Sequence, residues 1–175
     1  MSTQTIDDLP TPALILDRAI LNRNLKRMSD RLRDAGVMLR PHLKTAKSIE
    51  IGRRAVEGHD GRITVSTLAE ACYFADGGFK DILYGVGIVP SKLPAISELR
   101  RRGVNLRVVT DNLAVANAIV AAATNGDTFS VLIEIDSGGG RAGLPYPEMP
   151  GLLDIARVLH DAPGVELAGV MTHAG

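Results

Sequence analysis

Short apolar runs alternate along the chain with longer segments in which apolar residues recur at helical spacing. The clearest helical segment runs from Arg18 to Ala35, and Gly36 follows it as a stop signal. Its apolar stripe consists of Ile20, Leu21, Leu25, Met28 and Leu32. Strands are predicted at residues 13–16, 37–44, 62–66, 81–86, 106–109, 129–136 and 167–171. The other helices are predicted at residues 45–56, 67–77, 91–102, 112–124 and 147–160.

The order of these elements predicts a parallel sheet covered by helices, because short, mostly apolar strands are each followed by a helix. One helix start is well marked, since Thr67 can cap it and Glu70 stands at the third position. Counting from the run at 37–44, the number of strands suits both a doubly wound sheet and a (β/α)8 barrel. No compositional break marks a linker, so we expect one domain over residues 1–175.

The composition is that of a globular chain, with 175 residues, 45% of them hydrophobic, and a formal net charge of zero. A balanced charge argues against a nucleic-acid partner, which needs a basic excess. The lone Cys72 excludes an internal disulfide and a cysteine-based zinc cluster, so no metal site is predicted within the chain. The polar N-terminus is unlike a signal peptide, and no apolar run approaches about 18 residues. We therefore expect a cytoplasmic protein without membrane contact.

Polar residues lie at or just past the ends of the predicted strands. They are Lys44, Thr67, Tyr84, Asp111, Arg141 and His173. In a barrel the carboxyl ends of the strands share one rim, where reacting groups gather. Lys44 is the most distinctive of them, because a desolvated lysine amine can form a Schiff base with an aldehyde. Since strands commonly end in polar residues and lysines are mostly exposed, this pattern supports a site without deciding it.

A glycine-rich loop at residues 138–143 has the spacing G-x-G-x-x-G after a predicted strand. A dinucleotide site would need this loop to open a helix directly and the next strand to end in an acid. Pro145 and Pro147 delay the helix, and the next strand ends at Thr172–His173, so this interpretation is disfavoured. The glycines allow close backbone approach to a ligand, and Arg141 could donate hydrogen bonds to an anionic oxygen.

Four motifs follow one another at strand ends: RPHLKTAKS at 40–48, VSTLAEA at 65–71, IEIDSGGGRAGL at 133–144 and GVMTHAG at 169–175. With LPTPALILDRAILNRNLKRM at 9–28, they resemble the fold-type III pyridoxal-phosphate enzymes of the alanine racemase N-terminal-domain superfamily. The likeness is greatest to the branch of D-serine dehydratases and D-threonine aldolases. It covers essentially all of the chain from Leu9 onward.

The resemblance implies an α/β fold, namely an incomplete (β/α)8 TIM-type barrel of about six βα units. The chain would be the N-terminal part of a barrel domain that binds pyridoxal 5'-phosphate. The strand at 13–16 would belong to an absent C-terminal β-domain. Lys44 is implied to hold the cofactor as a Schiff base, with Lys47 the weaker candidate. Arg141 is implied to contact the phenolic oxygen, and His173 to pack near the pyridine ring.

The activity implied is that of a lyase for D-amino acids with a β-hydroxyl group, by elimination or retro-aldol cleavage, with Lys44 as the catalytic residue. A divalent metal in the absent β-domain and a homodimer of the full-length enzyme are implied as well. The alternatives are an amino-acid racemase of the same fold, a non-catalytic pyridoxal-phosphate-binding protein and an inactive fragment. Residues 1–175 alone are expected to be inactive, because barrel strands and most of the phosphate site would be missing.

Overall fold

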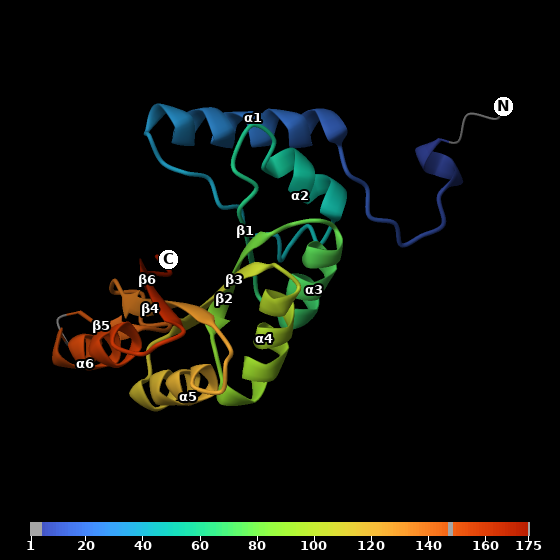
Figure 1. The fold of residues 1–175 in the computed structure, drawn as a ribbon. Coiled ribbons are helices and arrows are strands. Elements are labelled where there is room, and N and C mark those ends of the chain that lie inside the picture. Colours follow the sequence, from blue (N-terminus) through green and yellow to red (C-terminus); the bar gives the residue numbers. More distant parts are fainter. Residues whose placement is uncertain (1–4, 147–148, 175) are drawn as a thin grey trace. The chain divides into compact units, whose positions relative to one another are not determined.

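The structure, a computed structural model, describes residues 5–146 and 149–174. It divides into two compact units, Met1–Met38 and Leu39–Gly175. The first unit holds the 3-10 turn η1 (Ile6–Asp8) and the long helix α1 (Arg18–Asp34), which confirms the helix predicted there (Figure 1). Asp17 caps α1 by accepting a hydrogen bond from the backbone N–H of Ile20. After the helix ends at Asp34, Gly36 adopts a left-handed backbone conformation with φ at 65°.

The strand expected at residues 13–16 is not formed in the structure. No described segment pairs with residues 10–17, and the side chain of Leu14 is fully exposed. A strand exists only where a neighbour accepts and donates its backbone hydrogen bonds. Apolar alternation alone therefore could not make this segment a strand.

The second unit is built on a parallel sheet whose main strands follow one another in chain order. These strands are β1 (Ile63–Val65), β2 (Asp81–Gly87), β3 (Asn105–Thr110), β4 (Phe129–Asp136) and β6 (Val165–Met171). Each pairs in parallel with the next, and the short β5 (Leu144–Pro145) pairs with the last two residues of β4. A doubly wound sheet reverses its strand order at a switch point. The sequential order therefore favours the barrel, of which this sheet forms an arc.

Helices cover one face of this sheet (Figure 1). They are α2 (Ile49–Ala55), α3 (Leu68–Asp76), η2 (Pro90–Lys92) leading into α4 (Leu93–Arg101), α5 (Leu113–Ala123) and α6 (Met149–His160). The core lies between the two layers, where alternate strand residues such as Ile82 and Val108 pack with helix residues such as Phe74 and Ile119. Coverage of one face is the arrangement of a barrel wall, whose other face lines the interior.

The interior face carries a charged network near the amino-terminal ends of the strands. Asp81, which begins β2, accepts hydrogen bonds from Arg40 at 2.7 Å and from Arg107 at 2.9 Å. Arg40 also donates to the carbonyl oxygen of Ile63 at 3.1 Å. Burial by itself raises the pKa of Asp81, but the two guanidinium groups bring it below its ordinary value. The network therefore ties the segment that precedes Lys44 to the first three strands.

The strand predicted at 37–44 is reduced to a single bridge among the described residues. His42 pairs with Thr64, and the backbone N–H of Leu43 donates to the carbonyl of Thr64 at 2.9 Å. Thr64 in turn donates to the carbonyl of Pro41 at 2.8 Å. Because proline has no backbone N–H, a regular ladder cannot continue through it. The following helix also begins late, at Ile49 instead of residue 45.

Candidate cofactor site

Lys44 lies just past the His42–Thr64 bridge, on the carboxyl-terminal side of β1. Its side chain is exposed, and its amine makes no hydrogen bond or ion pair with the part of the chain that the structure describes. Lys47 differs, because its Nζ lies 3.4 Å from Oε1 of Glu70. Condensation with an aldehyde needs an uncommitted amine. The geometry therefore favours Lys44 over Lys47 as the lysine that could hold an aldehyde cofactor.

The imidazole of His42 lies beside Lys44. Its Nδ1 accepts the backbone N–H of Lys44 at 3.3 Å, and its Nε2 lies 3.2 Å from Oγ of Ser66. Burial and then the charge of Lys44 lower the pKa of His42; His173 acts in the same direction and Glu70 opposes them. Lys44 and His173, which are far apart in the sequence, therefore lie within electrostatic reach of one imidazole.

Arg141 and His173 meet directly at the carboxyl-terminal side of the sheet. Nη1 of Arg141 lies 2.9 Å from Nε2 of His173. A guanidinium group can only donate hydrogen bonds, so Nε2 of His173 is the acceptor in this contact. The hydroxyl of Thr172 also donates to Oγ of Ser137 at 2.9 Å. The loop after β4 and the end of β6 are thus joined twice.

Two carboxylates organise the glycine-rich loop. Asp136 accepts the backbone N–H groups of Gly138 at 2.9 Å and Gly140 at 3.1 Å, and Asp111 accepts that of Gly143 at 2.9 Å. The loop then returns to β4 as β5, and α6 begins at residue 149. A dinucleotide site would open a helix directly from this loop, so the structure disfavours it as the sequence did. The predicted helix start at residue 147 lies outside the described residues.

Glu134 is a buried carboxylate on β4, with 4% of its surface exposed. Burial and then Asp111 raise its pKa above the ordinary 4.5, while His173 and Arg141 act in the opposite direction. Glu134 therefore belongs to the same electrostatic cluster as Arg141 and His173. Its charged form is disfavoured on balance.

Sequence reasoning missed both His42 and Glu134 as parts of this site, although a signal was present. His42 stands two residues before Lys44, and Glu134 two residues before Asp136. Alternate residues of an extended segment point to the same face. The set of predicted site residues could therefore have been extended to polar residues two positions away from each member.

Of the residues predicted at the rim, Tyr84 lies in the core and the hydroxyl of Thr67 is engaged in capping a helix. Tyr84 lies within β2 and packs into the core on the helix side, with 1% of its surface exposed, so its assignment to the rim was wrong. Its hydroxyl accepts a hydrogen bond from Nζ of Lys92 at 2.6 Å. The hydroxyl of Thr67 accepts the backbone N–H of Glu70 at 3.1 Å and so caps α3, as predicted.

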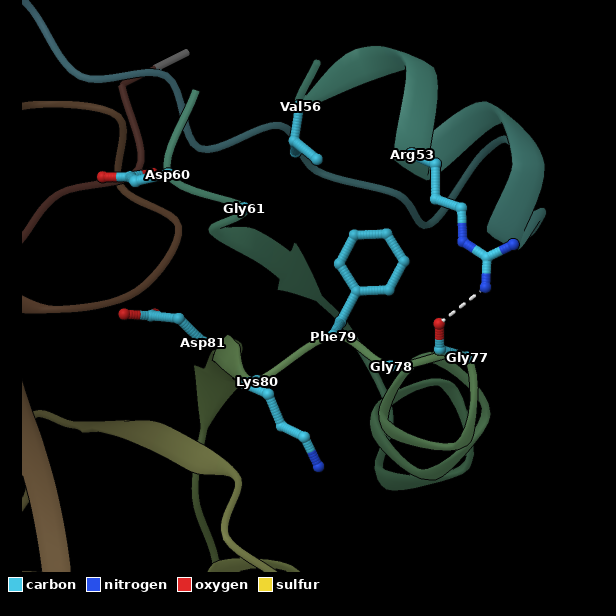
Figure 2. Close-up of a pocket in the computed structure, with 9 residues that line it drawn as sticks. All are labelled: Arg53, Val56, Asp60, Gly61, Gly77, Gly78, Phe79, Lys80 and Asp81. Atoms are coloured by element: carbon cyan, nitrogen blue, oxygen red, sulfur yellow. Dashed lines mark hydrogen bonds between the residues drawn. The ribbon is translucent and has the colours of Figure 1, made fainter. Parts of the chain in front are cut away.

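A pocket of about 330 Å³ lies away from these residues (Figure 2). Its lining comes from the end of α2 and from the segments that precede β1 and β2, including Gly61 and Phe79. Figure 2 shows Arg53 donating to the carbonyl oxygen of Gly77, at 3.0 Å. These segments are at the amino-terminal ends of the strands, opposite the rim that carries Lys44. The pocket is therefore separate from the candidate site.

The residues at the rim suit two functional groups of pyridoxal phosphate. The uncommitted amine of Lys44 suits the aldehyde, and the guanidinium of Arg141 suits the phenolic oxygen. Over residues 5–146 and 149–174, no group of three or more His, Cys, Asp or Glu side chains is placed to hold a metal ion. Over the same ranges, no helix is both long and apolar enough to cross a bilayer.

Comparison with known proteins finds a family. The family model described as the alanine racemase N-terminal domain matches residues 16–175. D-threo-3-hydroxyaspartate dehydratase from Delftia sp. strain HT23 is 45% identical over 172 residues, covering 98% of this chain and 45% of that protein. D-serine dehydratase from Schizosaccharomyces pombe is 33% identical, covering 98% of this chain and 44% of that protein. The chain spans about half the length of the curated relatives it matches.

Solved structures agree with the sequence comparison. The Delftia dehydratase superposes with a TM-score of 0.91 at 44% identity, covering 94% of this chain and 44% of that one. D-threonine aldolase from Filomicrobium marinum gives a TM-score of 0.85 at 32% identity, with the same two coverages. One mutant form of a D-threo-3-hydroxyaspartate dehydratase is described as metal-free. The family and the barrel-type α/β fold expected from the motifs are thereby confirmed.

Proposed function

Because the chain belongs to the family of the alanine racemase N-terminal domain, we propose that the complete gene product is a pyridoxal-phosphate-dependent lyase acting on D-amino acids with a β-hydroxyl group. The relatives named above are dehydratases or aldolases whose named substrates all carry that hydroxyl. The observation that carries the proposal is the uncommitted amine of Lys44 at the rim. His173, which contacts Arg141, lies with Lys44 within electrostatic reach of His42.

Each residue of the site has a task in this reaction. Bound pyridoxal phosphate would supply a ring that accepts the electron pair released at the substrate Cα. Lys44 would hold the cofactor by its aldehyde and, once displaced by the substrate amine, would be free to take the proton from Cα. Arg141 would donate to the phenolic oxygen, and His173 would hold the guanidinium in place by accepting its second hydrogen bond.

We favour dehydration over aldol cleavage, because the 45% identical relative is a dehydratase. Loss of the β-hydroxyl as water leaves an enamine, which hydrolyses to a 2-oxo acid and ammonia. Cleavage of the Cα–Cβ bond would instead give glycine and an aldehyde. The complete gene product, supplied with pyridoxal phosphate, should therefore release a 2-oxo acid and ammonia from D-threo-3-hydroxyaspartate or D-serine. Glycine from D-threonine would indicate the aldolase, and interconversion of enantiomers without either product would refute the lyase.

The lysine assignment has a matched pair of variants. Lys44→Ala should abolish the visible absorbance of protein-bound pyridoxal phosphate and all turnover, because no amine would then hold the aldehyde. Lys47→Ala should keep the absorbance, because that amine is paired with Glu70. Loss of the absorbance in the Lys47 variant alone would show that the assignment is reversed.

The remaining parts of the proposal rest on the family. We also propose that the reaction takes place in the cytoplasm. A homodimer and a divalent metal held by a C-terminal β-domain complete the proposal. The metal-free form of a relative supports the metal, since such a description implies a form that contains one.

A further inference from the structure

His42 connects the candidate lysine to the first strand of the sheet in two ways. Its backbone forms the bridge with Thr64. Its side chain reaches both ways along the rim, with Nδ1 accepting the backbone N–H of Lys44 at 3.3 Å and Nε2 lying 3.2 Å from Oγ of Ser66. The ring therefore spans from the residue that presents the amine to the residue that directly follows β1.

These contacts determine the protonation of the ring. A backbone N–H can only donate, so Nδ1 of His42 must carry a lone pair, and the ring proton lies on Nε2. Nε2 then donates to Oγ of Ser66. A doubly protonated imidazolium would lose the contact with Lys44, because it would have no acceptor atom. The geometry is consequently that of a neutral imidazole with a defined tautomer.

The surroundings of His42 favour the neutral form. Burial of the ring opposes a positive charge most; Lys44, on the same segment as His42, and His173, after β6, act in the same direction, and Glu70 on α3 attracts such a charge. The carboxylate of Glu70 is already engaged, because it accepts the backbone N–H of Ser66 at 2.8 Å and pairs with Lys47 at 3.4 Å. Its pull on His42 is therefore shared with two other groups.

We propose that His42 is a positioning residue for Lys44: as a neutral imidazole it fixes the backbone of Lys44 to the end of β1 and keeps a second positive charge away from the amine. The proposal rests on the proposed function, since it assigns His42 a task at the lysine that holds the cofactor. Acid would interrupt that task, because a proton on Nδ1 removes the acceptor.

Two substitutions separate the two ring contacts. The side-chain oxygen of Asn lies near the place of Nδ1, so His42→Asn keeps an acceptor for Lys44. The amide nitrogen of Gln lies near the place of Nε2, so His42→Gln keeps only the donor toward Ser66. His160→Asn is the matched control, because His160 is exposed at the end of α6, which leads into the amino-terminal end of β6, opposite the rim.

The measurements are the affinity of the complete gene product for pyridoxal phosphate, by absorbance titration, and its dependence on pH. His42→Asn should bind within about twofold of wild type, and His42→Gln about five- to tenfold more weakly, the effect of one lost hydrogen bond. The wild type and His160→Asn should lose affinity as pH falls through the range below 6.5, whereas His42→Asn should be flatter there. Equal affinities for the Asn and Gln variants, or an unchanged pH profile in His42→Asn, would overturn the proposal.

The same titration separates this inference from the function on which it rests. If Lys44→Ala abolishes the absorbance while both His42 variants match wild type, the lysine assignment stands and the role of His42 is wrong. If Lys44→Ala keeps the absorbance, the function itself fails. Circular dichroism of each variant shows whether it has folded, and the comparison of Asn with Gln decides the question even if larger changes at His42 do not fold.

Discussion

Gly143 is the position in the site loop where a single methyl group should do most damage. It has φ at 101°, and a Cβ placed there would lie 2.6 Å from the backbone N of Asp136 and 2.6 Å from the carbonyl carbon of Ile135. Both atoms belong to the last two residues of β4, whose backbone pairs with β5 directly after Gly143. Gly138, in the same loop, has nearly the same φ, 105°, but no atom within 4 Å of its Cβ position. The two glycines therefore share the backbone strain and differ in the clash.

The magnitudes follow from this comparison. Gly138→Ala should cost about 1–2 kcal/mol, the penalty of a non-glycine residue at positive φ. Gly143→Ala carries the same strain and adds about 1–3 kcal/mol for overpacking against a rigid neighbour. Its total of about 2–5 kcal/mol is a large part of a domain's usual 5–15 kcal/mol. The methyl group would also push the loop that carries Arg141 away from His173.

Urea unfolding of the cofactor-free complete gene product measures the first effect, and absorbance titration with pyridoxal phosphate measures the second. We expect a lower unfolding midpoint and weaker cofactor binding for Gly143→Ala than for Gly138→Ala. If the free energies of unfolding of the two variants agree within about 0.5 kcal/mol, the clash does not exist and the reasoning is refuted.

Two further predictions concern the half-buried carboxylate of Asp81 and the buried carboxylate of Glu134. Asp81→Asn should destabilise the protein by about 1–3 kcal/mol at pH 7, because Arg40 and Arg107 lose a charged acceptor. Since the folded-state pKa of Asp81 is lowered below 3.8, the difference between variant and wild type in the free energy of urea unfolding should shrink as pH falls below that value. A difference that stays constant with pH would contradict the pairing. Glu134→Gln should stabilise the cofactor-free protein at neutral pH, because the raised folded-state pKa of Glu134 makes its ionised form unfavourable at pH values above the ordinary pKa of 4.5. The gain in urea unfolding midpoint should vanish as pH falls to about 4. A variant less stable than wild type at pH 7 would contradict this reasoning.

The sequence by itself determined the elements whose causes are local. The periodicity from Arg18 onward predicted α1, and Thr67 with Glu70 marked the start of α3. The apolar run at 129–136 coincides with β4. These succeed because helix caps, glycine stops and apolar spacing act between residues a few positions apart. The four motifs also sufficed to indicate the family.

The tertiary structure alone decided what depends on distant partners. Strand count left the barrel and the doubly wound sheet open, and only the sequential pairing chose between them. The apolar segment at 13–16 has no described partner and is not a strand, and Tyr84 turned toward the helices although it stood near a strand end. The protonation of His42 follows from a contact with Lys44 two residues away, but its second ring contact, with Ser66, joins positions 24 residues apart. Hydrogen bonds between segments far apart in the sequence decide which strands pair and which face a side chain occupies.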